Sequence, residues 1–388
     1  MSLQSCSAPR AGFPRRWLPA LLLLLSPLAA CAPQAPRYAA PVFVAPAAMQ
    51  EAPRGRVGLL LPLSGANRQL GQAMLNASQL ALFDQGDRSI EFLPKDTSGT
   101  ANGAAEAARS AIAEGARALA GPLTLGETAA AAGPARAARA PLIAFTSDAA
   151  QAGGGVWVLG MTPTEQAERM AGAAAMDGAR RIGLLAPDDE FGRRLAAALR
   201  TRLPALGLPP PFVQLHPRLG DSAQAARTLA EQAGPEGLDA VLLGLGGERA
   251  RTAAAALAAA LPTRPRFLGI ATWGTDPGLA QEPALVDAWF PGPDPAIRAQ
   301  FDSRYQAAFG ERPPPLAGIA YDAAALASRS LRDGIGSPPV GEALLGADGP
   351  IRLTPDGLAQ RGLAIFAVDP SGEPRLIQPA PVPGAPGT

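Results

Sequence analysis

The sequence has few of the side chains on which most catalytic and metal sites depend. It contains two cysteines, one histidine and one lysine. A zinc site and histidine-dependent nucleophilic catalysis both need a histidine that other side chains support, and a single histidine offers no such set. We therefore expect His216, which stands directly before Pro217 at the end of an apolar run, to be a surface or loop residue. We expect no metal, no cofactor and no enzymatic activity.

Net charge and nucleotide-binding motifs are also lacking. The 34 Lys and Arg residues nearly balance the 33 Asp and Glu residues, so the chain has no general attraction for nucleic acid or acidic surfaces. The glycines of 244–247 follow an apolar run but lack the GxGxxG spacing, and no Walker lysine pattern occurs. The sequence thus gives no support for a nucleic-acid partner or for a nucleotide-dependent enzyme.

The amino-terminal residues have the features of an export signal. Arg10, Arg15 and Arg16 precede an apolar run at 17–25, which is shorter than the roughly 20 residues of a membrane span. Leu28-Ala29-Ala30 then stands directly before Cys31, as in a bacterial lipobox. We interpret 1–30 as a lipoprotein signal peptide and Cys31 as the lipid-bearing first residue of the mature chain. The alternatives are an ordinary signal peptide with a chance cysteine, or a membrane anchor.

Cleavage there would remove Cys6 and leave no pair of cysteines for a disulfide. An exported chain without disulfides depends on its hydrophobic core, and the remaining length is enough for two domains. The segment 31–54 is rich in proline and alanine without periodicity and is predicted to be a tether. The similar tail at 379–388 is predicted to be disordered.

The folded part begins with a strand followed by a helix. The continuous apolar run at 57–61 is typical of a parallel strand that is covered on both faces. After the polar turn at 62–65, apolar residues recur at helical spacing at Leu70, Met74, Ala77 and Ala81. Further strand-like runs, separated by helical patterns, lie at 90–93, 118–120, 142–144, 182–186, 212–215, 240–243 and 267–270. This alternation predicts an α/β fold with two doubly wound, parallel-sheet lobes.

Several short motifs follow one another in an order that suggests a family. They are LLPLSG and LGQAM within 60–74, DTSGT at 96–100, GPLTLGE at 121–127, PLIAFTSD at 141–148, APDDEFGRRLA at 186–196 and AYDAAALA at 320–327. Together they resemble type I periplasmic binding proteins of the leucine-binding family, over roughly 55 to 370. The resemblance is closer still to the penicillin-binding protein activator lipoproteins (LpoA-like).

This resemblance implies a binding-protein domain at 55–378 whose chain crosses between the lobes three times. The crossings are expected near 159–163, near 290–293 and after Leu331. The first lobe would comprise about 55–162 and 291–331, and the second about 163–290 and 332–378. The helices around Phe301 and at 318–331 would return to the first lobe, and terminal strands at 351–353 and 365–368 would complete the second.

Polar side chains at the carboxyl ends of the predicted strands are the candidate ligand-cleft residues, because open α/β sheets bind ligands there. With helix amino termini, such hydroxyls suit an anionic or zwitterionic ligand, although Ser and Thr at these places also cap helices. The acidic cluster at 188–190 is interpreted as a helix start rather than a metal site. The candidates are Ser64, Thr124, Thr146, Ser147, Asp148, Thr272 and Trp273.

The candidate positions depart from the amino-acid binders that they resemble. Leu125 stands where those proteins usually have a serine, Asp148 where a threonine helps to hold the ligand carboxylate, and Thr272 where an acid pairs with the ligand amino group. An unpaired Asp148 would repel a carboxylate. These departures weaken the expectation of amino-acid binding. The resemblance to the activator lipoproteins then implies an envelope lipoprotein that binds a penicillin-binding protein, on the periplasmic side and anchored in the outer membrane. The alternative is a substrate-binding lipoprotein that delivers an amino acid, peptide or wall fragment to an ABC permease.

Overall fold

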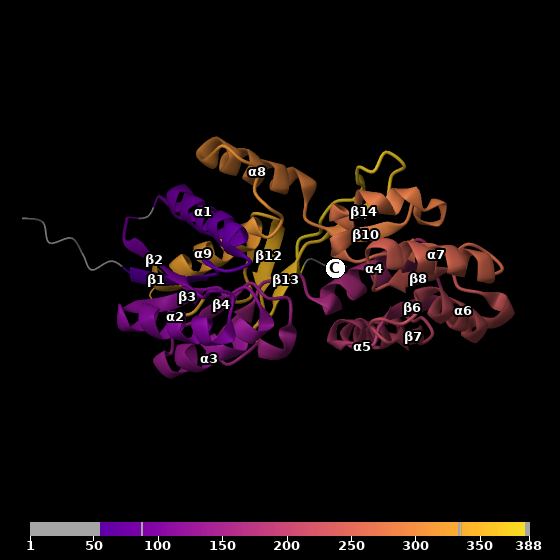
Figure 1. Cartoon of the computed structure of the whole chain (residues 1–388), viewed down its shortest axis with the longest axis horizontal. Helices are drawn as coiled ribbons and strands as arrows, with labels where there is room; N and C mark the ends of the chain where they lie inside the picture. The colour runs from indigo at the N-terminus through magenta and orange to yellow at the C-terminus, as the bar shows by residue number, and fades with distance from the viewer. Residues whose placement is uncertain (1–54, 87, 333, 335, 385–388) are drawn as a thin grey trace, which may run out of the picture. The chain divides into compact units, whose positions relative to one another are not determined.

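The computed structural model describes residues 55–86, 88–332, 334 and 336–384. The predicted signal peptide at 1–30, Cys31, the tether at 31–54 and residues 385–388 lie outside this part of the chain. Strands and helices alternate through the described residues, and the strands form two larger sheets and one smaller sheet (Figure 1). The predicted α/β fold is confirmed.

The first large sheet is entirely parallel. Its strands are β1 (Gly55–Leu61), β2 (Ile90–Asp96), β3 (Ala116–Ala120), β4 (Leu142–Ala144) and β5 (Val156–Val158), in the order β2-β1-β3-β4-β5. The chain therefore winds outward from β1 to β2 and then returns past β1 to β3. All residues from Val57 to Leu61 are buried, as expected for a strand covered on both faces.

Helices cover both faces of this sheet. Leu59 belongs to a core shared with α1 (Arg68–Gln85), α8 (Pro295–Phe309) and α9 (Ala317–Arg332), whereas Leu60 belongs to a core shared with α2 (Ala101–Ala113) and α3 (Leu125–Ala138). Figure 1 shows α1 and α9 on one side of β1–β4 and α2 and α3 on the other. Helices α8 and α9 thus pack in the core of the first lobe.

The second large sheet is mixed. Its order is β15-β14-β10-β9-β8-β6-β7, with β14 and β15 antiparallel to their neighbours and the other pairs parallel. The strands are β6 (Ile182–Pro187), β7 (Phe212–His216), β8 (Ala240–Leu243), β9 (Arg266–Leu268), β10 (Trp289–Gly292), β14 (Ala364–Ala367) and β15 (Arg375–Gln378).

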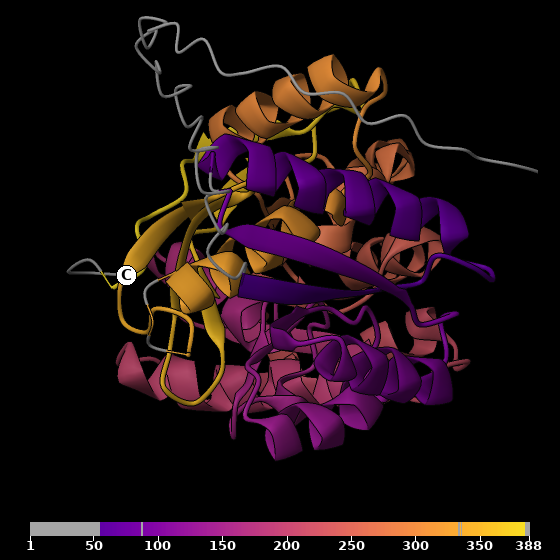
Figure 2. The same ribbon diagram turned by 90° about the vertical axis from the view of Figure 1, so that its left-hand side faces the viewer.

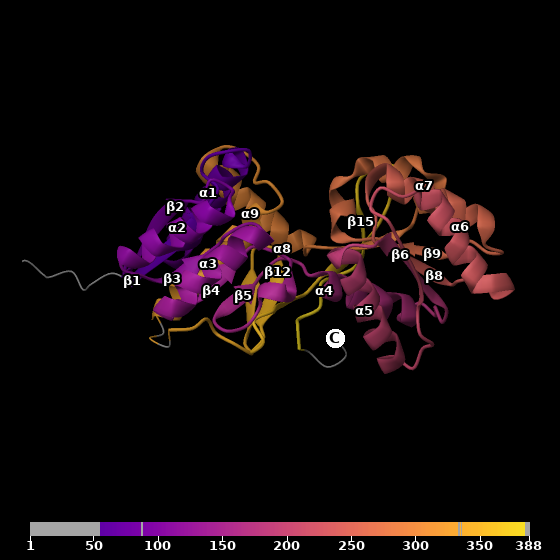
Figure 3. The same cartoon turned by 60° about the horizontal axis from the view of Figure 1, so that its bottom comes forward.

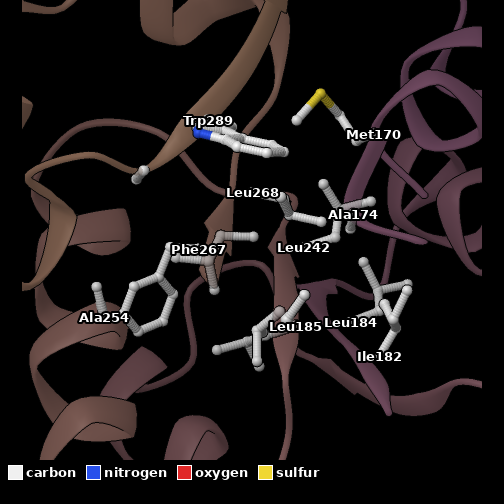
Figure 4. Close-up of a cluster of buried hydrophobic side chains, with 14 of the residues drawn as sticks. Met170, Ala174, Ile182, Leu184, Leu185, Leu242, Ala254, Phe267, Leu268 and Trp289 are labelled. Carbon is white, nitrogen blue, oxygen red and sulfur yellow. The ribbon is translucent and has the colours of Figure 1, made fainter. Parts of the chain in front are cut away.

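Four helices pack against this sheet in two pairs. Helix α4 (Pro163–Met176) packs against α5 (Glu190–Ala205), and α6 (Ser222–Ala233) packs against α7 (Gly247–Ala260) (Figure 3). Figure 4 shows their contribution to the core, with Met170 and Ala174 near one face of the sheet and Ala254 beside Phe267 near the other. Within the described residues, short 3₁₀ helices lie at Ala149–Gln151, Gly234–Glu236, Ala271–Thr275, Pro277–Gln281 and Pro283–Leu285.

Glycine allows two helices to begin close to the strand that precedes them. A Cβ atom on Gly71, in the first turn of α1, would lie 2.1 Å from the carbonyl oxygen of Pro62. A Cβ atom on Gly192, in the first turn of α5, would lie 1.9 Å from the carbonyl oxygen of Pro187. These contacts explain the glycines of the LGQAM and EFG motifs, because any other residue would force the helix away from the strand end.

The small sheet corrects one part of the predicted domain organisation. Strands β11 (Ala343–Gly346), β12 (Gly349–Leu353) and β13 (Ala359–Arg361) are antiparallel, in the order β11-β12-β13. Ile351 and Leu353 lie on the same face of β12, and both pack in the core of the first lobe. The prediction that 351–353 completes the second lobe, with a crossing after Leu331, is therefore wrong. The chain crosses between β13 and β14 instead, and Ile365 of β14 lies in the second core.

The carboxyl-terminal segment is described as far as residue 384. It has no helix or strand after β15, but Pro383 is buried. The carbonyl oxygen of Pro381 also lies so close to Gly362 that a Cβ atom there would be 2.1 Å away. Contrary to the predicted disorder from 379, this stretch packs against the folded part.

Candidate functional site

Four parallel strands of the first lobe end at one edge of their sheet, and the candidate residues of that lobe follow them. Ser64 follows β1, Thr124 follows β3, and Thr146, Ser147 and Asp148 follow β4. We call this region, together with the end of β2, the strand-end surface. Its capacity to hold a ligand depends on which of its donors are free.

Asp96, at the end of β2, takes up the backbone donors of two neighbouring loops. Its Oδ1 accepts hydrogen bonds from the N–H groups of Leu63, Ser64 and Ser98, at 2.9, 3.1 and 2.7 Å. Partial burial raises the pKa of Asp96, but hydrogen bonds from Ser64, Ser98 and Leu63 outweigh it and lower the pKa below its usual value. The backbone donors that could have bound an anionic ligand are therefore bonded to a carboxylate of the chain itself.

Glu127 occupies the next pair of donors. Its buried carboxylate accepts hydrogen bonds from the Thr124 N–H and hydroxyl, at 3.0 and 2.8 Å, and from the Thr97 hydroxyl at 2.5 Å. Thr124 in turn accepts from the Glu127 N–H, which completes a capping box at the start of α3. Thr124 thus caps a helix. The T-x-x-E spacing carries this signal in the sequence, although Glu127 was not among the candidates.

The loop after β4 is organised by its own aspartate. The Asp148 N–H donates to the Thr146 hydroxyl at 3.1 Å, and Asp148 Oδ1 accepts from the Ala150 N–H at 2.8 Å. Asp148 Oδ1 also lies 4.0 Å from an Nη atom of Arg194 on α5. Ser147 is exposed beside them. A carboxylate therefore occupies this part of the strand-end surface as well.

The acidic cluster at 188–190 has the helix-start role that was predicted for it. Asp189 caps α5, because its Oδ1 accepts from the Gly192 N–H at 3.0 Å. Asp188 pairs with Arg193 at 2.9 Å and Glu190 with Arg194 at 2.9 Å. No group of three or more His, Cys, Asp or Glu residues suited to a metal ion occurs in the described part of the chain.

The candidates of the second lobe differ in exposure. Thr272 is exposed in the 3₁₀ helix after β9. Trp273 is only 2% exposed, and its indole N–H donates to the carbonyl of Leu245 at 2.7 Å. The expectation that Trp273 faces a ligand is therefore wrong, because its ring fills the space above Gly269 in the second core.

His216 also departs from its prediction. It ends β7, but its side chain is buried rather than exposed, and its Nδ1 lies 2.9 Å from the carbonyl oxygen of Pro217. An Nη atom of Arg249 lies 3.4 Å from the same nitrogen. The nearby positive charge and the local backbone contact fit a structural histidine, and among the described residues no carboxylate is bonded to it to orient it as a base.

The sequence analysis did not identify a buried group of hydrogen bonds and one ion pair around Arg361, where the chain passes between the lobes. Arg361 of β13 donates from Nε to the Leu159 carbonyl at 2.8 Å and from its backbone N–H to Glu165 at 2.9 Å. Its guanidinium pairs with Asp322 of α9 at 3.2 Å, and the two side chains are only 3% and 1% exposed. Arg361 therefore joins the first crossing, the start of α4 and the last helix of the first lobe.

Burial is the main cause of the pKa shifts of the two acidic residues in this group, Asp322 and Glu165. It raises the pKa of Asp322 to about 6, although the nearby positive charge of Arg361 opposes the shift. Burial likewise raises the pKa of Glu165, against hydrogen bonds from Thr162 and Arg361. The positions of Asp322 and Arg361, 39 residues apart, gave no local signal of the pairing.

The second crossing has its own ion-pair group. Arg298 of α8 pairs with Asp302 at 2.6 Å and with Asp348 at 2.9 Å. The carbonyl of Asp348 accepts from the Asp294 N–H at the start of α8. The turn between β11 and β12 is thereby attached to the segment through which the chain re-enters the first lobe.

Four cavities in the described part of the chain lie mainly away from the strand-end surface. The largest two, of about 700 and 510 Å³, lie between α8 and β11 and at the amino ends of β8 and β9, respectively. One of about 190 Å³ includes Trp273, and one of about 340 Å³ lies beside α9. Trp273 is the only sequence-predicted candidate that lines any of these four. None of the described helices is both long and apolar enough to traverse a lipid bilayer.

The comparisons with known families and with solved structures agree on the fold of this chain. A family model described as "Periplasmic binding protein" matches residues 55–347. A search of curated proteins finds no match. A proposed branched-chain amino acid ABC transporter from Rhodospirillum rubrum shares 20% identity, with a TM-score of 0.71, over 84% of this chain and 100% of that chain.

Structures of LpoA from Haemophilus influenzae are also similar to this chain. Its C-domain, described as a regulator of PBP1A, shares 18% identity with a TM-score of 0.65, over 83% of this chain and 100% of that chain. Full-length LpoA shares 18% identity with a TM-score of 0.64, over 85% of this chain and 60% of its own length. At these identities the likeness is one of fold, and it extends to transporters and to a regulator alike.

Proposed function

This chain belongs to the periplasmic binding protein family, and from that membership we propose that it is a non-enzymatic regulator of a penicillin-binding protein. In this proposal the folded part is an interaction module for a peptidoglycan synthase. It needs no transported ligand and no lobe closure to act.

The occupied donors of the strand-end surface are the observation that carries this proposal. Asp96 holds three backbone N–H groups, and Glu127 holds both donors of Thr124. An incoming carboxylate would have to displace these internal acceptors and would meet the negative charges of Asp96 and Asp148. Glu127 is the buried member of this group, and leaving its carboxylate without the Thr124 donors would cost about 1–3 kcal/mol. Ligand capture at this surface is therefore disfavoured.

The cellular location is part of the same proposal. Cys31, outside the described residues, would carry lipid at the outer membrane, and the tether at 31–54 would allow the folded part to reach the wall. An extended chain spans at most about 3.3–3.6 Å per residue, which limits this reach to roughly 80 Å. The likeness to LpoA, described as a regulator of PBP1A, supports a partner of this class.

Reconstitution with purified synthases tests the proposal. The full-length protein in detergent should bind at least one penicillin-binding protein of its own cell and increase its rate of glycan polymerisation or peptide crosslinking. The matched control is Asp96→Asn, which alters the strand-end surface. It should stimulate the synthase as well as the wild type does, because the proposal assigns no ligand to that surface.

The rival function is substrate delivery to an ABC permease. Chemical crosslinking in intact envelopes distinguishes the two, because a regulator should be joined to a penicillin-binding protein and a delivery protein to a permease. Capture of a permease, together with the failure of every purified synthase to respond, would refute the regulator proposal.

A further inference from the structure

The strands of the first lobe begin at one edge of their sheet, opposite the strand-end surface. All five strands are parallel, and α1, α2 and α3 each return to this edge before the next strand begins. Arg88 lies just before β2, Arg117 is in the first turn of chain of β3, and Arg139 directly follows α3. All three residues are exposed. In the order β2-β1-β3-β4, three strand spacings of about 4.8 Å place their backbones within roughly 15 Å of one another.

These arginines have no acidic partner in the part of the chain that the structure describes. The side chains of Arg88, Arg117 and Arg139 make no ion pair or hydrogen bond there. Arg136, one turn before Arg139 on α3, donates only to backbone carbonyl groups of the turn at 153–154. We call these four arginines the amino-edge surface.

The other charges near this edge are balanced. Arg56 of β1 pairs with Glu91 at 3.0 Å, the carboxylate that follows α2 pairs with Lys95, and the arginines at the end of α9 have partners of their own. In the sequence, Arg54 and Asp87 lie outside the described residues and carry opposite charges. The amino-edge surface is therefore a local excess of positive charge on a chain that is nearly neutral as a whole.

The corresponding edge of the second lobe mixes both signs of charge. Arg264 and Arg266 lie there, at the amino end of β9, but Asp177, Asp239 and Asp287 line the same cavity of about 510 Å³. Arg266 pairs with Asp177 at 3.4 Å. A composition rich in arginine does not by itself produce a positive edge, and the first lobe differs from the second in this respect.

The chain enters the first lobe at the same edge. Gly55 is the first residue of β1, so the predicted tether and Cys31, which lie outside the described residues, connect to the fold here. Phe83, in the last turn of α1, is 72% exposed. Figure 2 turns this lobe toward the viewer and shows α1 and β1, in indigo, beside α9 in orange. An exposed aromatic ring among arginines is typical of surfaces that enter the headgroup region of a bilayer.

We propose that the amino-edge surface docks on the anionic headgroups of the membrane to which the tether leads. Its guanidinium groups would pair with headgroup phosphates, for which arginine has a suitable bidentate geometry, and Phe83 would enter the headgroup region beside them. The strand-end surface would then face away from the membrane, toward the wall. This inference rests on the proposed lipid attachment, which keeps the edge close to a bilayer.

A lipid surface suits the spread of these charges. None of the four cavities described above includes an arginine of the amino-edge surface, so there is no shaped site for one acidic side chain. An anionic bilayer instead attracts every arginine that lies within about one Debye length, roughly 8 Å at physiological salt. Each contributes a factor of about five to binding, so three unpaired arginines together contribute about a hundredfold.

Hydrogen exchange on vesicles tests the docking. The full-length lipoprotein is reconstituted into vesicles of phosphatidylcholine, either alone or with one third phosphatidylglycerol. Backbone amides around Arg88 and Arg139 should exchange at least threefold more slowly on the anionic vesicles than on the neutral ones. Sodium chloride at 1 M, where the Debye length is about 3 Å, should remove the difference. Flotation with neutral vesicles reports the lipid anchor separately, so a missing anchor and a missing docking surface give different results.

A matched pair of double variants separates this edge from total charge. Arg88→Gln with Arg139→Gln should abolish the protection, because losing two arginines lowers the docking equilibrium constant about 25-fold. Arg180→Gln with Arg200→Gln changes the net charge equally and should leave the protection intact. Arg180 and Arg200 are exposed on the second lobe, and their side chains have no partner among the described residues.

Equal protection on neutral and anionic vesicles overturns the proposal, as does loss of protection in both double variants. So does weaker stimulation of a synthase in detergent by Arg88→Gln with Arg139→Gln, because the edge would then contact a protein. Failure of every synthase to respond would refute the regulator proposal and leave the vesicle results unchanged.

Discussion

Single carboxylates determine the character of the strand-end surface. Asp96 and Glu127 each accept several hydrogen bonds from the loops around them, and Asp148 organises the loop after β4. In a protein that captures anions, such donors point to an empty site. Here these donors are hydrogen-bonded to carboxylates of the chain itself, so the strand-end surface offers few free donors to a ligand.

Asp322 is a carboxylate whose protonation state should change near neutral pH. Its pKa of about 6 in the folded protein lies above the usual value of roughly 3.9, so the folded state binds its proton more tightly than the unfolded state does. The contribution of Asp322 to the free energy of unfolding therefore falls as the pH rises through the interval between these values. Acidification from pH 7 to pH 5 should act in the stabilising direction at this site.

The substitution Asp322→Asn isolates this effect, because asparagine has a similar shape but does not titrate. Relative to the variant, the wild type should gain about 1 kcal/mol of unfolding free energy between pH 7 and pH 5. Urea denaturation at pH 5, 6 and 7 measures the difference. Asp302→Asn, which removes a partner of Arg298, is the control and should not reproduce it. Parallel pH profiles for wild type and Asp322→Asn would contradict the assignment.

Cys31 carries the prediction about attachment. If it is acylated, metabolic labelling with a clickable fatty acid should mark the wild type and leave Cys31→Ser unmarked. Two or three acyl chains would hold the protein stably in the membrane, whereas one chain gives only marginal binding. Fractionation should accordingly move Cys31→Ser from the membrane to the soluble fraction. Equal labelling of the two proteins would exclude the lipid anchor.

The first turns of the helices depend on two kinds of residue, namely capping residues and glycines that a close tertiary contact requires. The capping boxes at Thr124 and Thr162 satisfy backbone donors in the first turns of α3 and α4. Gly71 has a different role, since the carbonyl of Pro62 lies where its Cβ would be. Within a helix, alanine is intrinsically favoured over glycine, so only the close contact explains why glycine is needed at position 71.

A pair of glycine substitutions tests this difference. Gly71→Ala should destabilise the protein by about 1–3 kcal/mol, because the added methyl group must push α1 away from β1. Gly172→Ala, within α4, should instead stabilise it by up to about 1 kcal/mol, since its Cβ would meet only Arg202 at an ordinary 3.8 Å. Thermal and urea unfolding of the two variants provide the comparison. A stabilising Gly71→Ala would show that α1 can shift freely.

Taken together, the two lobes and their crossings form a binding-protein fold whose strand-end donors are already occupied. We therefore expect leucine, isoleucine, valine and other common amino acids to leave the melting temperature unchanged. Binding at one hundred times the dissociation constant would add about 2.7 kcal/mol to the stability, which a melting curve would reveal. A leucine-binding protein of the same fold serves as the positive control. A dose-dependent rise with any amino acid would instead favour the delivery function.

Much of the architecture was predictable because its signals are local. The apolar run at 57–61, the helical spacing from Leu70 and the three-residue separation of Thr124 and Glu127 each lie within one element. Their meaning follows from backbone periodicity and from hydrogen bonds between near neighbours. The alternation of such elements was enough to predict the α/β fold and the parallel first sheet, whereas the second sheet is mixed because β14 and β15 are antiparallel to their neighbours. The interpretation of 188–190 as a helix start is confirmed for the same reason.

Contacts between residues distant in sequence decided the rest. An apolar strand such as 351–353 can cover either core, and only the packing of Ile351 and Leu353 assigns it to the first lobe. Trp273 has the same local sequence pattern as a loop tryptophan that is exposed to ligand, and only its burial in the folded structure distinguishes the two. The pairing of Arg361 with Asp322 and the amino-edge surface likewise depend on which segments meet in space. Sequence periodicity specifies which face of an element is apolar, but the fold determines what that face meets.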